Sequence, residues 1–505
     1  MELQHGTKVL RSLEAISKTT ARVEARLEPK VGIKKILETS ARVFLGDHER
    51  DEAEVRINGR VVTRIVFIDE NDGFNSEERT NNFSEKIILS NAAAVVELLP
   101  SAHVTEARTT DHTSSSADAQ VQLEITIMGL TSREVKFVRA INGEVETKTE
   151  KSRIATWGQL VTSKFEVEER IDLDRACEGV LGVDLTPTLR EIVVGDGKVT
   201  TKGSATITLQ ATKRTDELSI YNDNIEFDFS KTIQHKSLGI DDSVFGTITV
   251  ANIELRAESK DSPQLVVSAE LEFRGFSIVS EEVESLEDAF SFLNELELKT
   301  SAFEGILALP SHHSSIEVDS NLSLGEKSPF ITKILGVGTS SVSTLNIIPQ
   351  NDKVTIEGAI ASTVTYECEE KQLHSQALRV PFSTSVKIDG VTVNHNIQAK
   401  VDVTAVKVRA RRGRELLVDA RLGVALGATS TLTTRLVSDV ALGEVKRQDD
   451  SAILIYTVAE GETTWDIAKR LNCRASEILA QNNLEGGAPR AGEKIFIYRQ
   501  HVVSF

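Results

Sequence analysis

Apolar and polar residues alternate along most of this chain, which is the pattern of strands with one buried and one exposed face. In EVRINGRVVTRIVFI (54–68) the pair Asn58-Gly59 separates two alternating runs, as a two-residue hairpin turn does. Similar segments have Lys-Gly (202–203) or Glu-Gly (357–358) at that place, and neither pair favours such a turn. The sequence therefore predicts one strand with a glycine inside it, at a bulge, a bend or a close approach of another backbone.

The three segments belong to a repeated unit whose landmarks keep a nearly constant register. A leucine precedes each glycine by 22 or 23 residues, a phenylalanine follows it by 24 residues, and a valine lies further upstream. The landmarks are Gly59, Gly203 and Gly358; Leu37, Leu181 and Leu335; Phe83, Phe227 and Phe382; and Val23, Val167 and Val318. Four landmarks that recur three times indicate internal repetition. We expect single helical turns around the leucines and short antiparallel strands elsewhere.

The repeat predicts a mainly β protein with three antiparallel β-sandwich-like modules, each folding as a separate domain. Their predicted bounds are 1–150, 151–295 and 296–444, and a short charged linker is expected at 445–452. The second half of each module alternates strictly, as in ADAQVQLEITIMGL (117–130). A polar loop is expected at 101–119, and a looser connection at 285–296.

Composition narrows the classes of partner and location. With 76 acidic and 58 basic side chains the formal net charge is -18, which disfavours nucleic acid and anionic lipid as main partners. Cys177, Cys368 and Cys473 are isolated, so they predict no disulfide framework and fit a reducing compartment. The N-terminus has no secretory apolar region, and no run of about 18 apolar residues follows, so a cytoplasmic location without a transmembrane segment is expected.

No residue pattern predicts catalysis. The ten histidines are scattered, and the adjacent pair His312-His313 is expected in a solvated loop. GDGK (195–198) lacks the spacing of a phosphate-binding loop, and no Gly-x-Ser-x-Gly sequence occurs. We therefore predict a protein that is not an enzyme and that has no metal site and no cofactor.

Residues 453–500, near the end of the chain, predict a small α+β domain with the order strand, helix, helix, strand. Trp465, Ala468 and Leu471 lie on one face of the first helix, and Thr463 with Asp466 has the spacing of an N-terminal cap.

This segment resembles the LysM domain over its whole length. The matching positions are Tyr456, Val458, Gly461, Thr463, Trp465, Ile467, Ala468, Leu471, Ile478, Asn482, Leu484, Gly492, Ile495 and Ile497. LysM domains commonly bind N-acetylglucosamine polymers in a groove between two loops, and the resemblance implies that these loops supply the binding residues Gly461, Glu462, Thr463, Thr464, Asn482, Asn483, Leu484, Gly486 and Gly487. Glu462 replaces the usual Asp, and Arg474 stands where Ser or Thr often caps the second helix. Trp465, Ile467, Leu471 and Ile495 are expected in the core.

With this ending, the repeats resemble the SPOCS module of spore-forming bacteria, through the leucine segment, the Val-x-x-x-Gly strand, the phenylalanine and EDAFS (287–291). Three SPOCS modules before one LysM domain are similar to the SipL family of clostridial spore-coat morphogenetic proteins. That resemblance implies a mother-cell scaffold that assembles coat at the forespore surface and binds stage IV sporulation protein A through its LysM domain. The alternative is a cell-wall or cortex protein that binds peptidoglycan or other N-acetylglucosamine glycans. An enzyme hidden in the β modules is a third hypothesis.

Overall fold

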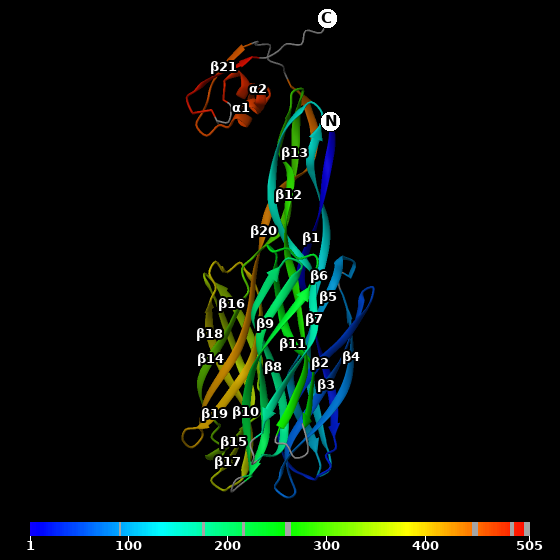
Figure 1. The fold of residues 1–505 in the computed structure, drawn as a ribbon, viewed down its shortest axis with the longest axis vertical. Helices are drawn as coiled ribbons and strands as arrows, with labels where there is room; N and C mark the ends of the chain where they lie inside the picture. Colours follow the sequence, from blue (N-terminus) through cyan, green and yellow to red (C-terminus); the bar gives the residue numbers. More distant parts are fainter. Residues whose placement is uncertain are drawn as a thin grey trace.

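The computed structural model shows strand-rich modules at one end, a narrow stalk of strands above them, and a small helical domain at the far end of the stalk (Figure 1). It describes residues 1–89, 92–173, 177–214, 218–257, 264–446, 453–484 and 489–498. The predicted fold class, antiparallel β modules followed by a βααβ domain, is confirmed.

Module 1 consists of two three-stranded antiparallel sheets packed face to face. The first sheet has the order β1–β6–β5, and the second has the order β2–β3–β4. The strands are β1 (Glu2–Leu27), β2 (Ile33–Asp51), β3 (Glu54–Asp69), β4 (Phe74–Ile88), β5 (Val95–His112) and β6 (Ala117–Asn142), with a short 3-10 helix at Ala92–Ala94. Strand β5 contacts β2, and β1 contacts β4, so the two sheets form a barrel-like sandwich.

Modules 2 and 3 repeat this arrangement. In module 2 the sheets are β7–β12–β11 and β8–β9–β10. These strands are β7 (Val145–Asp172), β8 (Cys177–Gly195), β9 (Lys198–Arg214), β10 (Leu218–Gln234), β11 (Ser243–Ala257) and β12 (Gln264–Ser291). In module 3 the place of the first strand is shared by two strands along β20, and the place of the second by two strands along β17. These strands are β13 (Asn294–Ala308), β14 (His312–Ser323), β15 (Ile331–Val337), β16 (Ser341–Gln350), β17 (Lys353–Cys368), β18 (Leu373–Lys387), β19 (Asn396–Ala410) and β20 (Glu415–Val445).

Each repeat glycine lies in the middle strand of its sheet, within one continuous strand as predicted. Gly203 pairs with Phe229 on one side and Leu189 on the other. A Cβ atom on Gly203 would lie 2.2 Å from the carbonyl oxygen of Thr188 and 2.5 Å from the Phe229 ring. The glycine therefore permits a close approach of the neighbouring strand beneath an aromatic ring.

The same pairing joins Gly59 to Phe83 and Gly358 to Phe382. The predicted landmark Phe227 is therefore wrong by two residues, because Phe229 is the residue that faces Gly203. Side chains repeat with a period of two along a strand, so Phe227 and Phe229 lie on the same face and the spacing alone does not separate them.

The repeat leucines lie in strands, and the predicted helical turns are wrong. Leu37, Leu181 and Leu335 belong to β2, β8 and β15, and the pairing register of each strand shifts at the leucine. Such a β-bulge interrupts the alternation, which explains the mistaken prediction. All three leucines are buried in one cluster that joins the three modules; its other buried members are Val66, Ile68, Phe74 and Ile220.

A buried arginine lies beside this cluster. Arg64 of β3 is 4% exposed, and its Nη2 donates to Oδ2 of Asp184 in β8 at 2.9 Å and to Oγ1 of Thr339 at 2.8 Å. The Thr339 hydroxyl donates to Asp184 at 3.0 Å, and the Thr339 backbone N–H donates to Glu38 at 2.9 Å. Burial alone would lower the pKa of Arg64, but the carboxylates of Asp184, Glu38 and Glu78 outweigh it and raise that pKa. The network therefore ties all three modules together.

The residue after each repeat leucine differs between the modules, and two of these residues shape this network. It is Glu38 in module 1 and a glycine, Gly182 or Gly336, in the other two modules. A Cβ atom on Gly182 would lie 1.9 Å from Nη1 of Arg64. One module thus supplies a carboxylate and another supplies the space that the arginine occupies.

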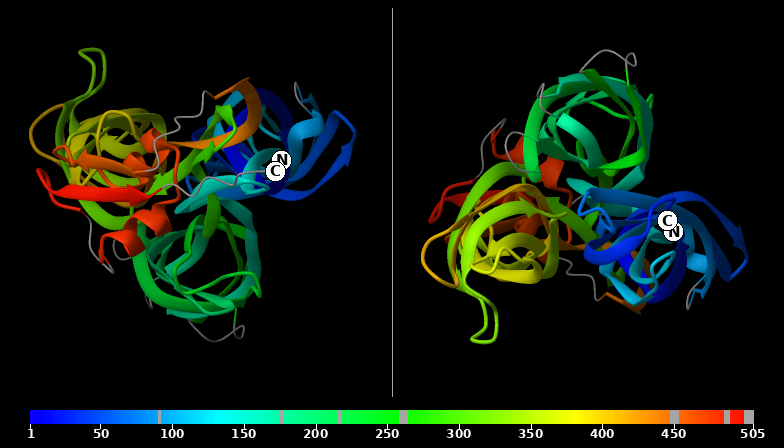
Figure 2. Two further views of the ribbon diagram at one scale, coloured as in Figure 1. Left: turned by 90° about the horizontal axis from the view of Figure 1, so that it is seen from above. Right: turned by 90° about the horizontal axis from the view of Figure 1, so that it is seen from below.

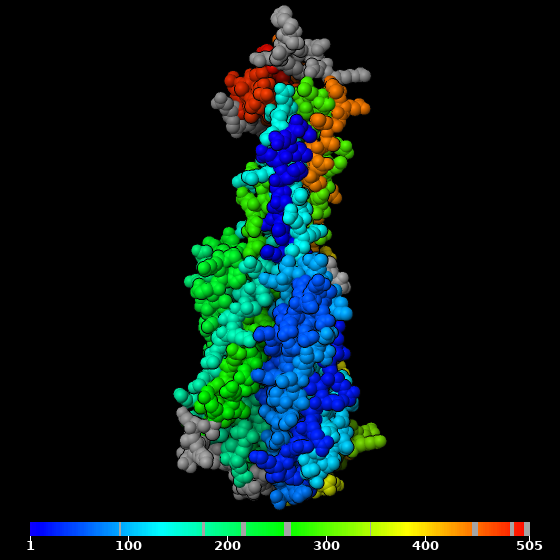
Figure 3. Space-filling model, turned by 90° about the vertical axis from the view of Figure 1, so that its right-hand side faces the viewer, coloured from blue at the N-terminus to red at the C-terminus, as the bar shows by residue number. Residues whose placement is uncertain are grey.

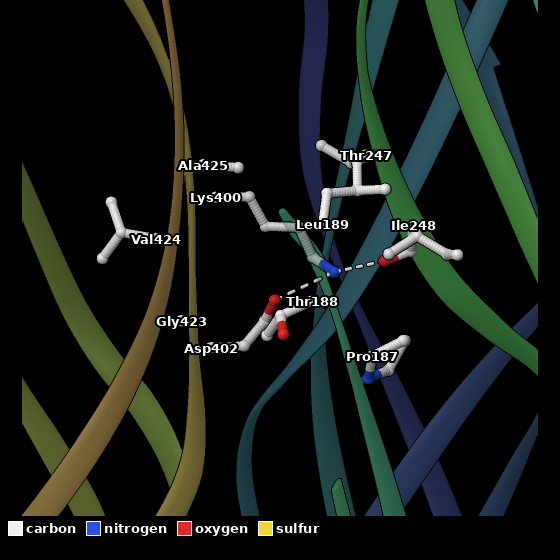
Figure 4. Close-up of a pocket in the computed structure, with 10 residues that line it drawn as sticks. All are labelled: Pro187, Thr188, Leu189, Thr247, Ile248, Lys400, Asp402, Gly423, Val424 and Ala425. Atoms are coloured by element: carbon white, nitrogen blue, oxygen red, sulfur yellow. Dashed lines mark hydrogen bonds and ion pairs between the residues drawn. The ribbon is translucent and has the colours of Figure 1, made fainter. Parts of the chain in front are cut away.

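Modules 2 and 3 also meet beside β8, β11 and β19. Nζ of Lys400 donates to the carbonyl oxygen of Ile248 and lies 3.0 Å from Oδ2 of Asp402 (Figure 4). The cavity between them is about 10 Å³, which is about the space that one water molecule needs. This contact therefore fits a packed interface better than a ligand site.

The stalk consists of three two-stranded ribbons. Its strands are the upper parts of β1 with β6, β7 with β12, and β13 with β20. One layer of its core takes residues from every module: Leu10, Phe137, Ile154, Val283, Phe303 and Leu436. Seen along the stalk, the three modules lie around a common axis, and the space-filling view shows modules 1 and 2 side by side beneath the narrow stalk (Figures 2 and 3). Because these layers take residues from every module, we predict that the three modules fold together, in place of the separate domains expected from the repeat.

Several predicted loops are strands. The segment 101–119 belongs to β5, a turn at 113–116 and the start of β6, and the segment 285–296 includes the end of β12. His312-His313 begins β14 and is half-buried, not in a solvated loop, and burial together with His312 lowers the pKa of His313 to about 4. The connections between modules lie at 143–144 and 292–293, a few residues before the predicted boundaries at 150 and 295.

Candidate functional site

The C-terminal domain packs two short helices against one face of a two-stranded sheet. Its elements are β21 (Ile453–Thr457), α1 (Thr464–Leu471), α2 (Ala475–Gln481) and β22 (Lys494–Tyr498). Helix α1 begins with the predicted cap, because the Thr463 hydroxyl accepts from the Asp466 N–H and the Asp466 carboxylate accepts from the Thr463 N–H. Ile467, Ile478 and Ile495 are buried between helices and sheet.

The first predicted binding loop is held by bonds within the domain. Gly461 has a φ of 78°, which suits a glycine at the turn. The Glu462 carboxylate accepts from the Tyr456 hydroxyl and from the Ala459 N–H at 2.9 Å, and it pairs with Arg470. The Ala459 N–H is the largest cause that lowers the pKa of Glu462, and Glu462 in turn raises the pKa of Tyr456. The hydrogen-bond and ion-pair partners of Glu462 described here thus lie inside the domain.

The other two residues of this loop are positioned by helix α1. Thr463 is its N-cap, and the bonds from Thr463 lower the pKa of Asp466. Thr464 is the first residue of the helix and is half-buried. The Thr463 hydroxyl is already bonded to Asp466, so it is not free to bond a sugar.

The second predicted loop contains a side chain that closes a sheet edge. The Asn482 amide donates to the carbonyl oxygen of Phe496 and accepts from the Phe496 N–H, both at 2.7 Å. Asn483 is exposed with a φ of 53°, and Leu484 is half-buried against the domain core. Asn482 is therefore structural. The predicted residues Gly486 and Gly487 lie outside the described residues.

The outer face of the sheet is apolar and exposed. Ile453 and Ile455 of β21 are each 60% exposed, and Phe496 and Tyr498 of β22 are 44% and 50% exposed. Ile453 pairs with Tyr498 and Ile455 pairs with Phe496, so the four side chains form one patch. The sequence prediction did not include this patch; its signal is that ILIYT and KIFIY have apolar residues at outward as well as inward positions.

The domain docks on the tip of the stalk through α1. Nε1 of Trp465 donates to Oδ2 of Asp288 at 2.9 Å, and Nζ of Lys469 lies 2.6 Å from the same carboxylate. The Trp465 ring lies 5.2 Å from the ring of Phe290, which is 2% exposed. Burial would raise the pKa of Asp288, but the bonds from Lys469 and Trp465 outweigh it and lower that pKa.

Three more contacts hold the domain on the stalk. Arg474 precedes α2 without a side-chain cap bond, and its Nε lies 3.7 Å from Oε1 of Glu146. Nδ2 of Asn472 donates to the carbonyl oxygen of Phe292 at 2.7 Å, and Nζ of Lys446 donates to Oδ1 of Asn472 at 3.3 Å. Arg474 stands where Ser or Thr often caps the helix, and its side chain contacts the stalk.

Two known family models match parts of this chain. Residues 331–411 match the family model described as SipL, SPOCS domain, and residues 456–497 match that of the LysM domain. The chain is similar to a SipL-type protein with a LysM domain. The matched SPOCS region runs from β15 to the end of β19, and modules 1 and 2 repeat its strand order. Neither the search of curated proteins nor that of solved structures gave a significant match.

The two matched families indicate a sporulation-related protein that carries a module type associated with peptidoglycan and glycan binding. Both families are non-catalytic. Among the described residues, no group of three or more His, Cys, Asp or Glu is placed to hold a metal ion. Within the same residues, no helix has the length and apolarity that a membrane crossing requires.

A hollow of about 540 Å³ opens in module 1 between β1, β4, β5 and β6. Arg22 on its wall lies 3.2 Å from Glu24, and Arg26 lies 2.9 Å from Glu28. These arginines already have carboxylate partners, so we assign no ligand to this hollow.

Proposed function

We propose that this chain is a non-enzymatic scaffold of spore-coat assembly that binds stage IV sporulation protein A through its LysM domain. It acts in the mother cell and assembles at the forespore surface. The partner and the location follow from the resemblance to the SipL family, and the SPOCS and LysM matches support it.

One observation favours a protein partner over a glycan. An exposed surface of the LysM domain without an internal role is the apolar patch of Ile453, Ile455, Phe496 and Tyr498, whereas the loop side chains of Glu462, Thr463 and Asn482 bond within the domain. Aromatic and aliphatic side chains at the centre of a patch are typical of protein interfaces. Sugar recognition, in contrast, needs polar groups that are free to bond the ligand.

The test is calorimetry of the full-length chain against stage IV sporulation protein A and, separately, against chitin oligomers. We expect binding to the protein that weakens at least about tenfold in Phe496→Asp, because a charge on the patch must be desolvated. Leu442→Asp is the matched control, since Leu442 is 56% exposed on the stalk strand β20 and lies outside the patch. Binding to the sugar and none to the protein would contradict the proposal and favour the cell-wall alternative.

The location has its own test. A fluorescent fusion in sporulating cells is expected to surround the forespore from the mother-cell side. Signal confined to the cell wall or to the cortex fraction would contradict a coat scaffold.

A further inference from the structure

One edge of the LysM sheet is closed by side chains. The Asn482 amide occupies the N–H and carbonyl groups of Phe496, and the Gln481 amide occupies those of Tyr498, at 2.8 Å and 3.2 Å. These backbone groups therefore point away from β21, toward α2. In an antiparallel pair, residues whose partners bond elsewhere form the non-hydrogen-bonded pairs.

The other edge follows from the same geometry. Ile455 is paired with Phe496 and Ile453 with Tyr498, so the N–H and carbonyl groups of both isoleucines point to the outer edge of β21. The alternation extends this to Thr457. No described residue bonds to these outer groups, and the docking contacts to the stalk come from α1 and from the residues next to it. Within the part of the chain that the structure describes, strand β21 therefore presents an open edge.

This edge lacks two of the features by which proteins protect edge strands, charge and proline. Charged residues and proline discourage pairing with another strand. Strand β21 is Ile-Leu-Ile-Tyr-Thr, with neither. Among the described strands at sheet edges, every other one has a charged residue or a proline, for example Glu317 in β14, Lys333 in β15 and Pro349 in β16. The exposed face beside the edge is apolar as well.

We propose that β21 is a strand-addition site, at which an extended segment of the partner protein continues the LysM sheet. This inference rests on the proposed function and specifies its binding mode. The N–H and carbonyl groups of Ile453, Ile455 and Thr457 bond to the incoming backbone. Alternate apolar side chains of the segment lie beside Ile453 and Ile455 on the outer face, next to Phe496 and Tyr498. The partner segment is about five residues long, rich in β-branched or aromatic residues, with no proline at the bonded positions.

The test uses Ile455→Pro in the full-length chain. The Ile455 N–H points outward, so proline removes an outer donor and places its ring at the edge without removing a bond to β22. We expect an unchanged circular dichroism spectrum and at least about tenfold weaker binding of stage IV sporulation protein A. Ile455→Thr keeps the N–H and the β-branched shape, so its loss should be smaller. Ile88→Thr, at a 79% exposed position in module 1, is the control for lost apolar surface.

Hydrogen exchange gives an independent readout, because strand addition protects the amides of Ile453, Ile455 and Thr457 when the partner is bound. Equal binding by the wild type and Ile455→Pro, or no added protection, would overturn strand addition and leave the proposed function intact. Absence of any complex with the wild-type chain would overturn both. A dimer of the chain alone that Ile455→Pro abolishes would assign the edge to a second copy and overturn the partner proposal.

Discussion

At the scale of residues, one glycine in each module pairs with a phenylalanine of the neighbouring strand, and in modules 1 and 2 a Cβ atom on it would collide with that ring. The repeat predicted that these glycines are structural, and the close contacts give the reason. The sequence did not show which phenylalanine covers Gly203, because Phe227 and Phe229 share a face.

Gly203→Val should destabilise the protein by about 2–4 kcal/mol. The new side chain would collide with the Thr188 carbonyl and the Phe229 ring, so strands β8 and β10 would have to move. Thermal unfolding of the full chain measures the change. Gly325→Val is the control, since a Cβ atom there meets nothing within 4 Å. Equal melting temperatures for the two variants would contradict this account.

The Arg64–Asp184 pair gives a second prediction. Arg64→Leu should cost about 3–5 kcal/mol, because it leaves the Asp184 carboxylate without its main partner in a largely buried site. Denaturant unfolding measures this loss. The Arg64→Leu/Asp184→Leu double variant should recover part of it, and a double variant no more stable than the single one would argue against an unpaired charge as the cause.

The same pair predicts how stability depends on pH. Burial would raise the pKa of Asp184, but Arg64 and Arg42 outweigh it and hold the pKa below its ordinary value of 3.8. A carboxyl with a lowered folded pKa contributes stability that is present above about pH 3.8 and lost as the pH falls through the folded pKa. Asp184→Asn should therefore flatten the fall in unfolding free energy below about pH 3.8, and an unchanged slope would contradict the assignment.

At the scale of elements, alternation predicted the strands well and failed where a bulge interrupts it. The segments around Leu37 and its two counterparts were interpreted as helical turns for this reason. The end of β12 was interpreted as a loose connection because polar residues and Asp288 interrupt its apolar pattern. Asp288 and Phe290 acquire their roles only from the LysM domain, about 180 residues later in the chain, so local pattern could not reveal them.

Asp288→Ala should release the LysM domain from the stalk while both parts stay folded. The variant removes the acceptor of Trp465 Nε1 and the partner of Lys469. Of the two tryptophans, Trp157 is 4% exposed in the stalk core, so a red shift of the emission would report on Trp465. Small-angle scattering should show a broader distribution of distances. Glu287→Ala, which removes only the pair with Lys148, is the control, and identical spectra for both variants would contradict the docking.

At the scale of the whole molecule, the threefold repetition predicted three modules but not the core layers that the modules share. Each repeat looks complete in sequence, because its landmarks recur within it. The three repeat leucines pack against one another across the modules, which their recurrence does not reveal, and the polar contacts depend on positions where the repeats differ, such as Glu38 against Gly182. Recurring landmarks show only what the repeats have in common within themselves. The sequence therefore predicted separate domains.

Module 2 alone (145–291) should therefore fail to fold cooperatively. Excision exposes its share of the leucine cluster and of the stalk core, including Leu181 and Ile154. Residues 1–446 should instead unfold in a single transition, with a denaturant dependence that fits exposure of all three modules. Circular dichroism and calorimetry compare the two, and a cooperative, native-like transition of the isolated module would show that the shared layers are dispensable.

The long strands of the stalk also fix the distance between the two ends of the molecule. Strand β12 runs for 28 residues, and at about 3.3 Å per residue it spans about 90 Å, with the LysM domain at one end and the turns of the modules at the other (Figure 1). Ligands held at the two ends would be kept apart by this length. Because faces alternate with a period of two, removing two residues from every stalk strand would shorten the spacing by about 7 Å and keep each side chain on its face. The number of residues in each stalk strand would then set the thickness of a layer built from such molecules.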